Sequence, residues 1–398
     1  VISSGFAEVN EEGKELEKRM AEIARKGKMR IVGPNCLGMV SSGISFYALM
    51  NMLIPRAGNV SVISQSGTLG SMAMAAASEQ SIGFSKFISS GNEADLHSED
   101  FIEYFAHDPQ TKVILAFIEG LKDGQKFFRV AKEASRNKPL VILKGGVTEA
   151  GAKAASSHTG SIAGSTLVYN AAFRQTGIIP ARDDKDMVDL IKAFSLLPLP
   201  KGRKIGIATA WGGHGVLASD ACVREGLNVP ELPQEAVKEL NQFLAPFWSH
   251  RNPIDITGAG IFGDFATQLL KSVEVLLSDK GIDAVICGIP AFGPPIERAI
   301  SRMDPNISQE VSKTSMASIA LSEREVAKNI IKLKEKYAKP ILGVVIGFYG
   351  QRESEGVKLL EDNGIPVYQT SHQAARVLSK LADYREYRDL TSSPAHKY

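Results

Sequence analysis

The alternation of apolar strand-like runs with amphipathic helical runs constrains the fold of this chain more than any other feature. Residues 60–63, 113–118 and 139–143 are apolar runs, and helical patterns separate them. Strands that alternate with helices favour parallel sheets covered on both faces. The sequence therefore predicts an α/β protein made of tandem doubly wound parallel sheets, flavodoxin-like or Rossmann-like, with ligands at the carboxyl ends of the strands.

The same patterns divide the chain of 398 residues into units. A helix over 11–26 and a short strand at 30–32 indicate that residues 1–54 end one domain. Residues 55–198 form a second unit that closes with a helix over 184–196, and Pro198, Pro200 and Gly202 follow it as a linker.

Residues 200–388 form a third unit, followed by a tail over 389–398. Its strands are expected at 204–209, 284–287, 341–346 and 365–368. A helix from His372 to about Arg388 closes it. The polar, poorly periodic segment from Gly293 to Ser322 is expected to be an excursion or a mobile loop.

Composition excludes several classes of protein. Hydrophobic residues make up 44% and charged residues 23%, as in ordinary globular proteins, and the formal net charge of +2 favours neither nucleic acid nor an anionic membrane as a partner. No run of 18 apolar residues predicts a membrane span. Three distant cysteines, Cys36, Cys222 and Cys287, fit a reducing cytoplasm, and no spacing of ligand residues predicts a metal site.

The N-terminus carries no targeting pattern. It starts at Val1 rather than at a methionine, and it lacks the charged and then apolar segments of a signal peptide. We expect the chain to be a fragment, or its numbering to start inside a longer protein.

One histidine, His158, lies among small residues in the segment 156–165. Small neighbours let other groups approach the imidazole and let the loop move. Imidazole can take and release a phosphoryl group near neutral pH. The segment therefore predicts either a phosphohistidine carrier or a flexible surface loop that happens to hold a histidine.

A strand over 60–63 runs directly into Ser64, Gln65, Ser66, Gly67 and Thr68, and a helix follows. Glycine lets backbone N–H groups approach a ligand, and the helix N-terminus favours an anion. The segment is either a phosphate-binding turn or an ordinary turn with a serine or threonine N-cap.

Two more features follow strands of the same unit. Glu119 ends the run 113–118, where its carboxylate would either hold one tautomer of a neighbouring histidine or be a solvated loop acid. Gly145 and Gly146 form a second close-approach turn directly before the His158 segment.

The third unit has its own glycine-rich turn at Gly212, Gly213 and Gly215. The G-x-G-x-x-G spacing and the ribose-binding acid of a dinucleotide site are missing. The turns 252–258 and 290–294, the latter with Phe292 and Gly293, either line a substrate pocket or only interrupt the secondary structure.

Four motifs taken in order, at 33–38, 64–69, 119–120 and 157–160, resemble the α part of nucleoside-diphosphate-forming acyl-CoA synthetases. The most similar members are the ADP-forming acetate–CoA ligases of the succinyl-CoA synthetase superfamily. The resemblance covers essentially the whole chain. It implies that the three units are, in order, the C-terminal part of a CoA-binding Rossmann domain, a ligase CoA domain and a second flavodoxin-like ligase domain.

The resemblance also implies roles for single residues. His158 matches the histidine that becomes phosphorylated, Glu119 the acid that holds it, and 64–68 the helix end that binds phosphate. Asn35 and Cys36 match a turn near the thiol end of CoA. Gly212, Gly213 and Gly215, with Phe292 and Gly293, would lie near a second phosphate-binding helix and the acyl pocket.

The implied reaction interconverts acyl-CoA, phosphate and ADP with a carboxylic acid, CoA and ATP. Compared with the pattern of the family, we expect most of the CoA-binding domain and the ATP-grasp domain to lie outside these 398 residues, on another chain or in a removed segment. We therefore expect an ATP-grasp domain or β subunit as partner, with Mg²⁺ accompanying the nucleotide there, and an oligomeric assembly. No metal bound by this chain itself is expected.

Three other functions remain to be weighed. A non-catalytic CoA- or acyl-CoA-sensing scaffold of the same fold is the main alternative, although retention of His158 and Glu119 argues against it. A nicotinamide oxidoreductase lacks its glycine fingerprint here, and a serine hydrolase lacks the G-x-S-x-G turn.

Overall fold

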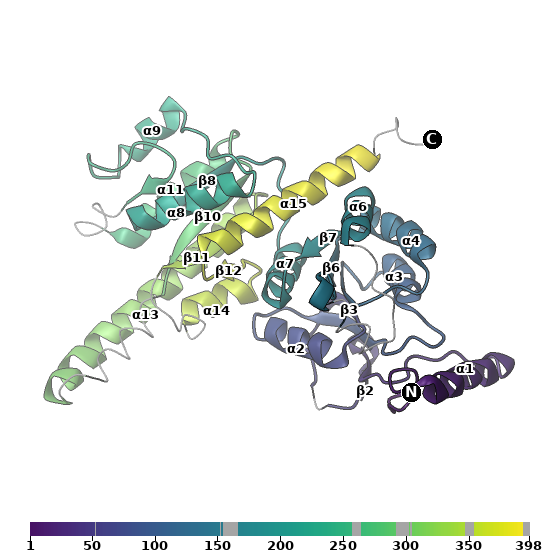
Figure 1. The fold of residues 1–398 in the computed structure, drawn as a ribbon. Helices are drawn as coiled ribbons and strands as arrows, with labels where there is room; N and C mark the ends of the chain where they lie inside the picture. Colours follow the sequence, from purple (N-terminus) through teal and green to yellow (C-terminus); the bar gives the residue numbers. More distant parts are fainter. Residues whose placement is uncertain are drawn as a thin grey trace. The chain divides into compact units, whose positions relative to one another are not determined.

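The structure is a computed structural model that describes residues 1–51, 53–151, 153, 166–256, 264–291, 302, 305–346 and 354–392. It divides into two compact units, one made of residues 1–195 and 386–398 and the other of residues 196–385. Each unit contains one sheet flanked by helices (Figure 1). Residues 1–54 lie within the first unit.

The first unit is built on a seven-stranded sheet with the order β2-β1-β4-β3-β5-β6-β7. Its strands are β1 (Gly38–Ser41), β2 (Phe46–Leu49), β3 (Ala57–Ser64), β4 (Phe84–Ser89), β5 (Val113–Ile118), β6 (Leu140–Lys144) and β7 (Ile179–Ala181). Strands β3 to β7 are parallel, as expected. Strands β1 and β2 form an antiparallel hairpin that pairs with β4 at the edge.

The prediction of a short strand at 30–32 is wrong. The N–H group of Ile31 donates to the carboxylate of Asp95 at 2.9 Å, and the N–H group of Leu96 donates to the carbonyl of Ile31 at 3.2 Å. The backbone hydrogen bonds of this segment therefore go to a loop rather than to a sheet.

Helices cover both faces of the first sheet. They are α2 (Gly67–Ser78), α3 (Ser98–His107), α4 (Gly124–Asn137), α6 (Thr166–Thr176) and α7 (Asp184–Leu196), and α1 (Glu11–Lys26) is a further helix of this unit. Phe105 of α3, Phe127 of α4 and Phe173 of α6 share one buried cluster with the β-strand side chains of one face. Helix α2 packs on β3 and β4, and Lys192 of α7 donates to Gln80 just beyond α2. The expected doubly wound arrangement is confirmed.

The second unit has a five-stranded, fully parallel sheet with the order β12-β11-β10-β8-β9. Its strands are β8 (Ile205–Thr209), β9 (Ile254–Asp255), β10 (Ala284–Pro290), β11 (Ile341–Ile346) and β12 (Val367–Tyr368). Its helices are α8 (Gly212–Arg224), α9 (Gln234–Leu240), α11 (Phe265–Ser278), α13 (Pro305–Lys336), α14 (Glu355–Asp362) and α15 (Ser371–Ser392).

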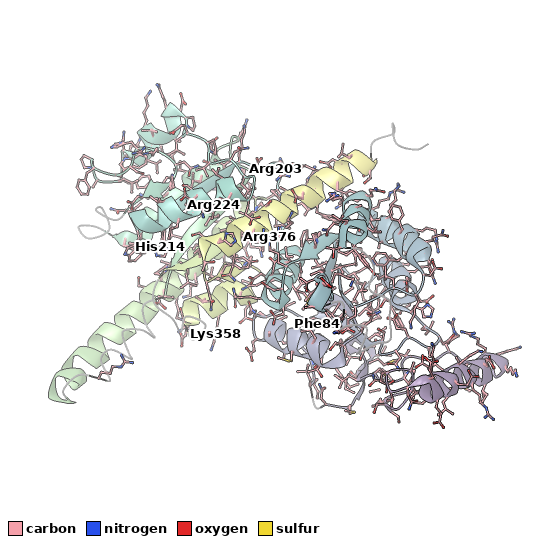
Figure 2. The ribbon with its side chains drawn as sticks, in the orientation of Figure 1. Phe84, Arg203, His214, Arg224, Lys358 and Arg376 are labelled. Carbon is pink, nitrogen blue, oxygen red and sulfur yellow. The ribbon has the colours of Figure 1, made fainter. Side chains whose placement is uncertain are left out.

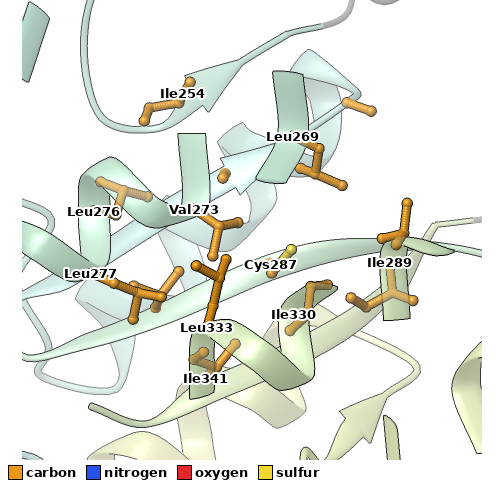
Figure 3. Packing of buried hydrophobic residues seen from close by; sticks show 14 of the residues in the cluster. Ile254, Leu269, Val273, Leu276, Leu277, Cys287, Ile289, Ile330, Leu333 and Ile341 are labelled. Atoms are coloured by element: carbon orange, nitrogen blue, oxygen red, sulfur yellow. The ribbon is translucent and has the colours of Figure 1, made fainter. Parts of the chain in front are cut away.

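Apolar side chains hold the helices of the second unit to its sheet. Val273 of α11 and Leu333 of α13 are buried with Cys287 and Ile289 of β10 (Figure 3). Arg376 of α15 adds a buried ion pair to this packing. Its guanidinium lies 3.7 Å from the carboxylate of Glu225, the residue after α8 (Figure 2).

The prediction of an excursion or loop from Gly293 to Ser322 is wrong over residues 305–322, which belong to α13. The packed part of this helix, with Val326, Ile330 and Leu333, lies near its C-terminal end. Adding residues to an existing helix is favourable, so the helix can continue from its packed part into neighbouring residues that lack a clear apolar period. Residues 293–301 lie outside the described residues. Within the described ranges, every helix is too short or too polar to cross a lipid bilayer.

Candidate functional site

The strand-to-helix turn after β3 places the first turn of α2 at the carboxyl edge of the first sheet. Ser66 is the N-cap, and its side-chain oxygen accepts a hydrogen bond from the N–H group of Leu69 at 3.4 Å. Thr68 in the first turn is exposed. The helix is 12 residues long, so its N-terminal N–H groups and dipole favour an anion at this edge.

A cavity of about 410 Å³ opens beside this helix end. It is lined by residues 2–4, 35–37, 65–68 and 91–92, together with Met50. The structure thus brings the predicted CoA-contacting residues Asn35 and Cys36 into one cavity with the predicted phosphate-binding residues Gln65 to Thr68. These two groups are about 30 positions apart in the chain.

Close backbone contacts form the wall of this cavity. A Cβ atom on Gly91, whose φ is +60°, would lie 2.2 Å from the carbonyl oxygen of Pro34. Asn35 also has a left-handed φ of 56°, and its amide donates to the Asn92 side chain at 3.2 Å. A Cβ on Gly67 would lie 2.6 Å from the Cβ of Leu37. Glycine is required where these segments meet.

Ser64 differs from its predicted neighbours. It is buried and does not line the cavity, and its hydroxyl donates to the carbonyl oxygen of Ser66 at 2.5 Å. Ser64 therefore stabilises the turn through this internal hydrogen bond.

Gln65 connects the cavity to Glu119. Its side-chain oxygen accepts hydrogen bonds from the N–H groups of Glu119 and Gly120 at 2.6 and 3.1 Å, and its nitrogen donates to the carbonyl of Gly120 at 2.8 Å. Glu119 itself is only 9% exposed and does not line the cavity. The end of β5 is therefore fixed by a side chain from the end of β3.

Lys144, the last residue of β6, holds the other side of the same turn. Its ammonium donates to the carbonyl of Glu119 at 2.8 Å and to the carbonyl of Gly145, and it lies 4.7 Å from the ring centroid of Tyr169. Burial lowers the pKa of Lys144, while the charge of Glu119 acts in the opposite direction.

A second buried acid lies close to this turn. Burial raises the pKa of Glu93 to about 7, although hydrogen bonds from Ser98 and Ser90 favour its charged form. The Glu93 carboxylate accepts from the Ser90 hydroxyl at 2.8 Å and from the Ser98 N–H group at 3.1 Å. Its neighbour Glu99 is fully buried and accepts from the N–H group of Asp123 at 3.1 Å.

The predicted phosphoryl carrier, His158, lies outside the described residues, as does the whole segment 156–165. Among the described residues on either side of it, the hydroxyl of Thr166 donates to the carbonyl of Val147 at 2.6 Å.

The glycine-rich segment of the second unit also follows the carboxyl end of a strand, because Gly212, Gly213 and Gly215 form the start of α8 after β8. A Cβ on Gly212 would lie 2.8 Å from the carboxylate of Asp255, at the end of β9, whereas Gly213 has open space around it. Gly215 packs against Pro253. Phe292 and Gly293, the other predicted pocket residues, lie outside the described residues.

Asn252, in the predicted turn 252–258, has a side chain that is hydrogen-bonded within the fold. Its side chain donates to the carbonyl of Ile205 at 2.8 Å and accepts from the N–H group of Ile207 at 2.9 Å. Both contacts are buried along β8. The side-chain amide of Asn252 therefore makes hydrogen bonds to β8 that the main chain of a neighbouring strand would otherwise make. Within the described residues, no three His, Cys, Asp or Glu side chains gather closely enough to hold a metal ion.

Sequence reasoning missed Lys144, Gly91 and Asn92. All three lie at or just after the carboxyl ends of strands, Lys144 in β6 and the other two after β4. The rule that selected Glu119 would have selected them as well.

Comparison with known proteins identifies the family. Residues 57–194 match the model of the succinyl-CoA ligase like flavodoxin domain, and residues 205–335 match the ligase-CoA domain. The alpha subunit of ADP-forming acetate–CoA ligase II from Pyrococcus furiosus is 37% identical over 379 residues, which cover 94% of this chain and 76% of that subunit. This chain belongs to the ADP-forming acyl-CoA synthetase family.

Two further comparisons agree with this family assignment. The alpha subunit of acetate–CoA ligase I from the same organism is 36% identical, with 98% of this chain and 77% of the subunit covered. A structure of acetyl-coenzyme A synthetase 1 from Ca. Korarchaeum cryptofilum, in complex with phosphate and ADP, has a TM-score of 0.83 at 32% identity and covers 99% of this chain and 79% of its own. Members of the family are acid–thiol ligases, which favours the enzyme over a non-catalytic scaffold.

Proposed function

We propose that this chain is the α part of an acyl-CoA synthetase that interconverts acyl-CoA, phosphate and ADP with a carboxylic acid, CoA and ATP. The observation that carries the proposal is the single cavity shared by Asn35 and Cys36 with the first turn of α2, in a chain of the ADP-forming ligase family. A thioester and an inorganic phosphate must meet in this reaction. Both predicted binding elements line the cavity, which supports the proposal.

In the proposed first step, phosphate held at the α2 end attacks the thioester carbonyl. The phosphate oxygen–carbon bond forms, the carbon–sulfur bond breaks, and the CoA sulfur leaves and takes up a proton. The product is an acyl phosphate. Gly67 and Thr68 present backbone N–H groups to the phosphate, and the helix dipole stabilises its charge without a bulky side chain.

In the second step, an imidazole nitrogen of His158 attacks the phosphorus. The nitrogen–phosphorus bond forms as the bond from phosphorus to the acyl oxygen breaks, and the carboxylate leaves. In the third step, the phosphoryl group passes from the nitrogen to the terminal phosphate of ADP, which gives ATP. Positioning and charge stabilisation supply most of the catalysis in phosphoryl transfer.

Glu119 has the proposed role of orienting His158. A carboxylate that accepts one ring N–H leaves the other nitrogen free to attack. The turn at Glu119 is held by Gln65 and Lys144, which would keep the carboxylate in place at the carboxyl edge of the sheet.

The nucleotide step is assigned to a partner. The relatives from Pyrococcus furiosus are alpha subunits, and we propose an ATP-grasp domain or β subunit that holds ADP or ATP with Mg²⁺. In this assignment residues 1–54 are the C-terminal part of a CoA-binding domain, and Gly212, Gly213 and Gly215 border the acyl and phosphate pocket with Phe292 and Gly293. We propose an oligomeric, cytoplasmic enzyme whose substrate is a small carboxylic acid.

Labelling with [γ-³²P]ATP and Mg²⁺ in the native assembly tests the proposal. We expect acid-labile label on this chain, its discharge by CoA plus a carboxylic acid, and its loss in His158→Ala. His107→Ala is the matched control, because His107 is exposed and hydrogen-bonds the carbonyl of Glu103 at 2.9 Å. Label that persists in His158→Ala would contradict the carrier role, and an unlabelled wild-type chain would instead favour the scaffold.

A further inference from the structure

Lys144 is a buried cation in the described part of the first unit that the proposed reaction has not yet used. It is 9% exposed. Its ammonium contacts two main-chain carbonyls and the Tyr169 ring, and within the described residues no carboxylate lies within ion-pair distance of it. A buried charge without an ion-pair partner costs folding free energy, so its presence calls for another explanation.

The position of Lys144 suggests that explanation. It ends β6, which pairs with β5 in parallel register, Ile118 opposite Lys144. Glu119 follows Ile118, and the N–H group of Gly145 donates to the carbonyl of Ile118 at 2.9 Å. A Cβ on Gly145 would lie 3.4 Å from the Cγ of Glu119. Lys144 therefore joins the Glu119 turn to the start of the segment that leads to His158.

We propose that Lys144 is a positioning residue for phosphoryl transfer: its ammonium holds the Glu119–Gly120 turn in place and supplies the positive charge beside the Glu119 carboxylate. The inference rests on the proposed function. The hydrogen bond to the carbonyl of Glu119 fixes the main chain from one side, and Gln65 fixes it from the other. Without the ammonium, the turn would be held from one side only, and the carboxylate would orient the imidazole less firmly.

Several other ionisable groups surround this pair. Tyr169 of α6 lies against the ammonium, and the charge of Glu99, on α3, acts on Tyr169. Glu93, in the loop before α3, is buried and feels the charge of Glu99 as well. These groups are acidic, and Lys144 is a cation among them, while Lys122 and His97 line a cavity with Glu93. The lowered pKa of Lys144 agrees with its burial.

Replacement of the charge tests the inference. In Lys144→Met and Lys144→Gln we expect phosphorylation of the native assembly by [γ-³²P]ATP to slow roughly 10- to 100-fold, at the lower end of the effects seen for proton-handling groups. The KM for ATP stays unchanged, because the proposed nucleotide site belongs to the partner and Lys144 is a residue of this chain. Lys144→Arg keeps the charge and restores most of the rate.

Lys138 offers a matched control within the same strand-and-helix unit. It precedes β6, and its ammonium likewise donates to two main-chain carbonyls, those of Phe105 at 2.8 Å and Asp108 at 2.5 Å. Burial lowers its pKa as well. It lies at the amino edge of the sheet, so Lys138→Met should lower stability without changing the phosphorylation rate.

The outcomes separate this inference from the proposed function. A wild-type chain that takes no label overturns both. Normal labelling of the wild type, together with an unchanged rate in Lys144→Met, overturns the role of Lys144 alone. Equal effects of Lys138→Met and Lys144→Met on the rate would overturn it too. Failure of both uncharged variants to fold would also count against it, because the lysine would then act on the whole unit.

Discussion

The amide oxygen of Gln65 accepts hydrogen bonds from the N–H groups of Glu119 and Gly120, at 2.6 and 3.1 Å. Gln65 also lines the cavity that contains the first turn of α2. One side chain therefore links the proposed phosphate site to the proposed histidine-orienting acid. A glutamine suits this position because its amide can accept and donate at once.

Gln65→Leu should impair both stability and phosphorylation. Two buried N–H groups and one carbonyl lose their partner, so we expect the free energy of unfolding to fall by about 2–4 kcal/mol. Displacement of the turn should also slow phosphorylation at least about 10-fold, since small misplacements have large effects on rate. Urea denaturation and a labelling time course measure the two effects.

Gln80→Leu is the control for that change. Gln80 is also buried; it donates to the carbonyl of Ala76 at 3.0 Å and accepts from Lys192 at 3.2 Å. It should lower stability and leave the phosphorylation rate of the folded protein unchanged. Equal slowing in both variants would show that the rate follows stability rather than the position of the turn.

Gly67→Ala should impair binding at the α2 end. The added Cβ would lie 2.6 Å from the Cβ of Leu37 and 3.0 Å from the hydroxyl of Ser89, so the first turn of the helix must shift. We expect the KM for phosphate to rise about 10-fold in the acyl-CoA-consuming direction, equivalent to about 1.4 kcal/mol of lost binding.

Gly124→Ala is the matched substitution, because nothing lies within 4 Å of a Cβ there and Gly124 is likewise the first residue of a helix. It should raise stability by up to about 1 kcal/mol through helix propensity. A phosphate KM that is the same in both variants would argue against phosphate binding at α2.

Glu119→Gln should slow phosphoryl transfer by roughly 10²-fold, a typical effect when an orienting or proton-handling carboxylate is lost. The amide keeps the size of the side chain, and the main-chain contacts to Gln65 and Lys144 can remain. Glu133→Gln on α4 is the control, since its side chain is 43% exposed. Rapid-quench measurement of the first turnover would decide the point, and a normal rate would remove Glu119 from the mechanism.

Glu93 should make the stability of the first unit depend on pH. Burial raises the pKa of its carboxyl from 4.5 to about 7, so the folded state keeps the proton to higher pH than the unfolded state. The free energy of unfolding therefore falls between about pH 4.5 and pH 7, by about 3 kcal/mol in total. Glu93→Gln lacks this titration and should gain stability relative to wild type across that window, as measured by urea denaturation from pH 5 to 8.

Asp108→Asn tests a carboxyl group whose pKa is shifted in the opposite direction from that of Glu93. Burial opposes ionisation of Asp108, but hydrogen bonds from Lys86 and Thr111 outweigh it and lower its pKa below 3.8. The stabilisation is lost only as the pH falls through the lowered pKa, so the variant should be less stable by a constant amount from pH 5 to 8. A Glu93→Gln curve parallel to that of wild type would refute the titration of Glu93.

Much of the fold could be predicted because its signals are local. The runs at 60–63 and 113–118 are apolar enough to need burial on both faces, and they appear as β3 and β5. The hairpin of β1 and β2 was missed because both strands are only four residues long and residues 46–48 of β2 are exposed, so β2 carries no buried pattern. The start of α13 was missed because its packed residues lie farther along the chain.

The candidate site divides in the same way. Glycines and hydroxyl residues after a strand predicted the α2 turn from the local sequence, and the cavity places Asn35 and Cys36 beside it. The burial of Lys144 and the inward hydrogen bond of Ser64 depend on which strands become neighbours. No local pattern contains that information.

The sequence by itself determined the alternating α/β elements, the turn at Ser64 to Thr68 and the family motifs, because backbone preferences and apolar periodicity act over a few residues. Only the tertiary structure decided that Gln65 and Lys144 hold the Glu119 turn from two sides. Those contacts join the ends of β3, β5 and β6, and strand order in a parallel sheet is settled by packing between distant segments rather than by the residues next to each strand.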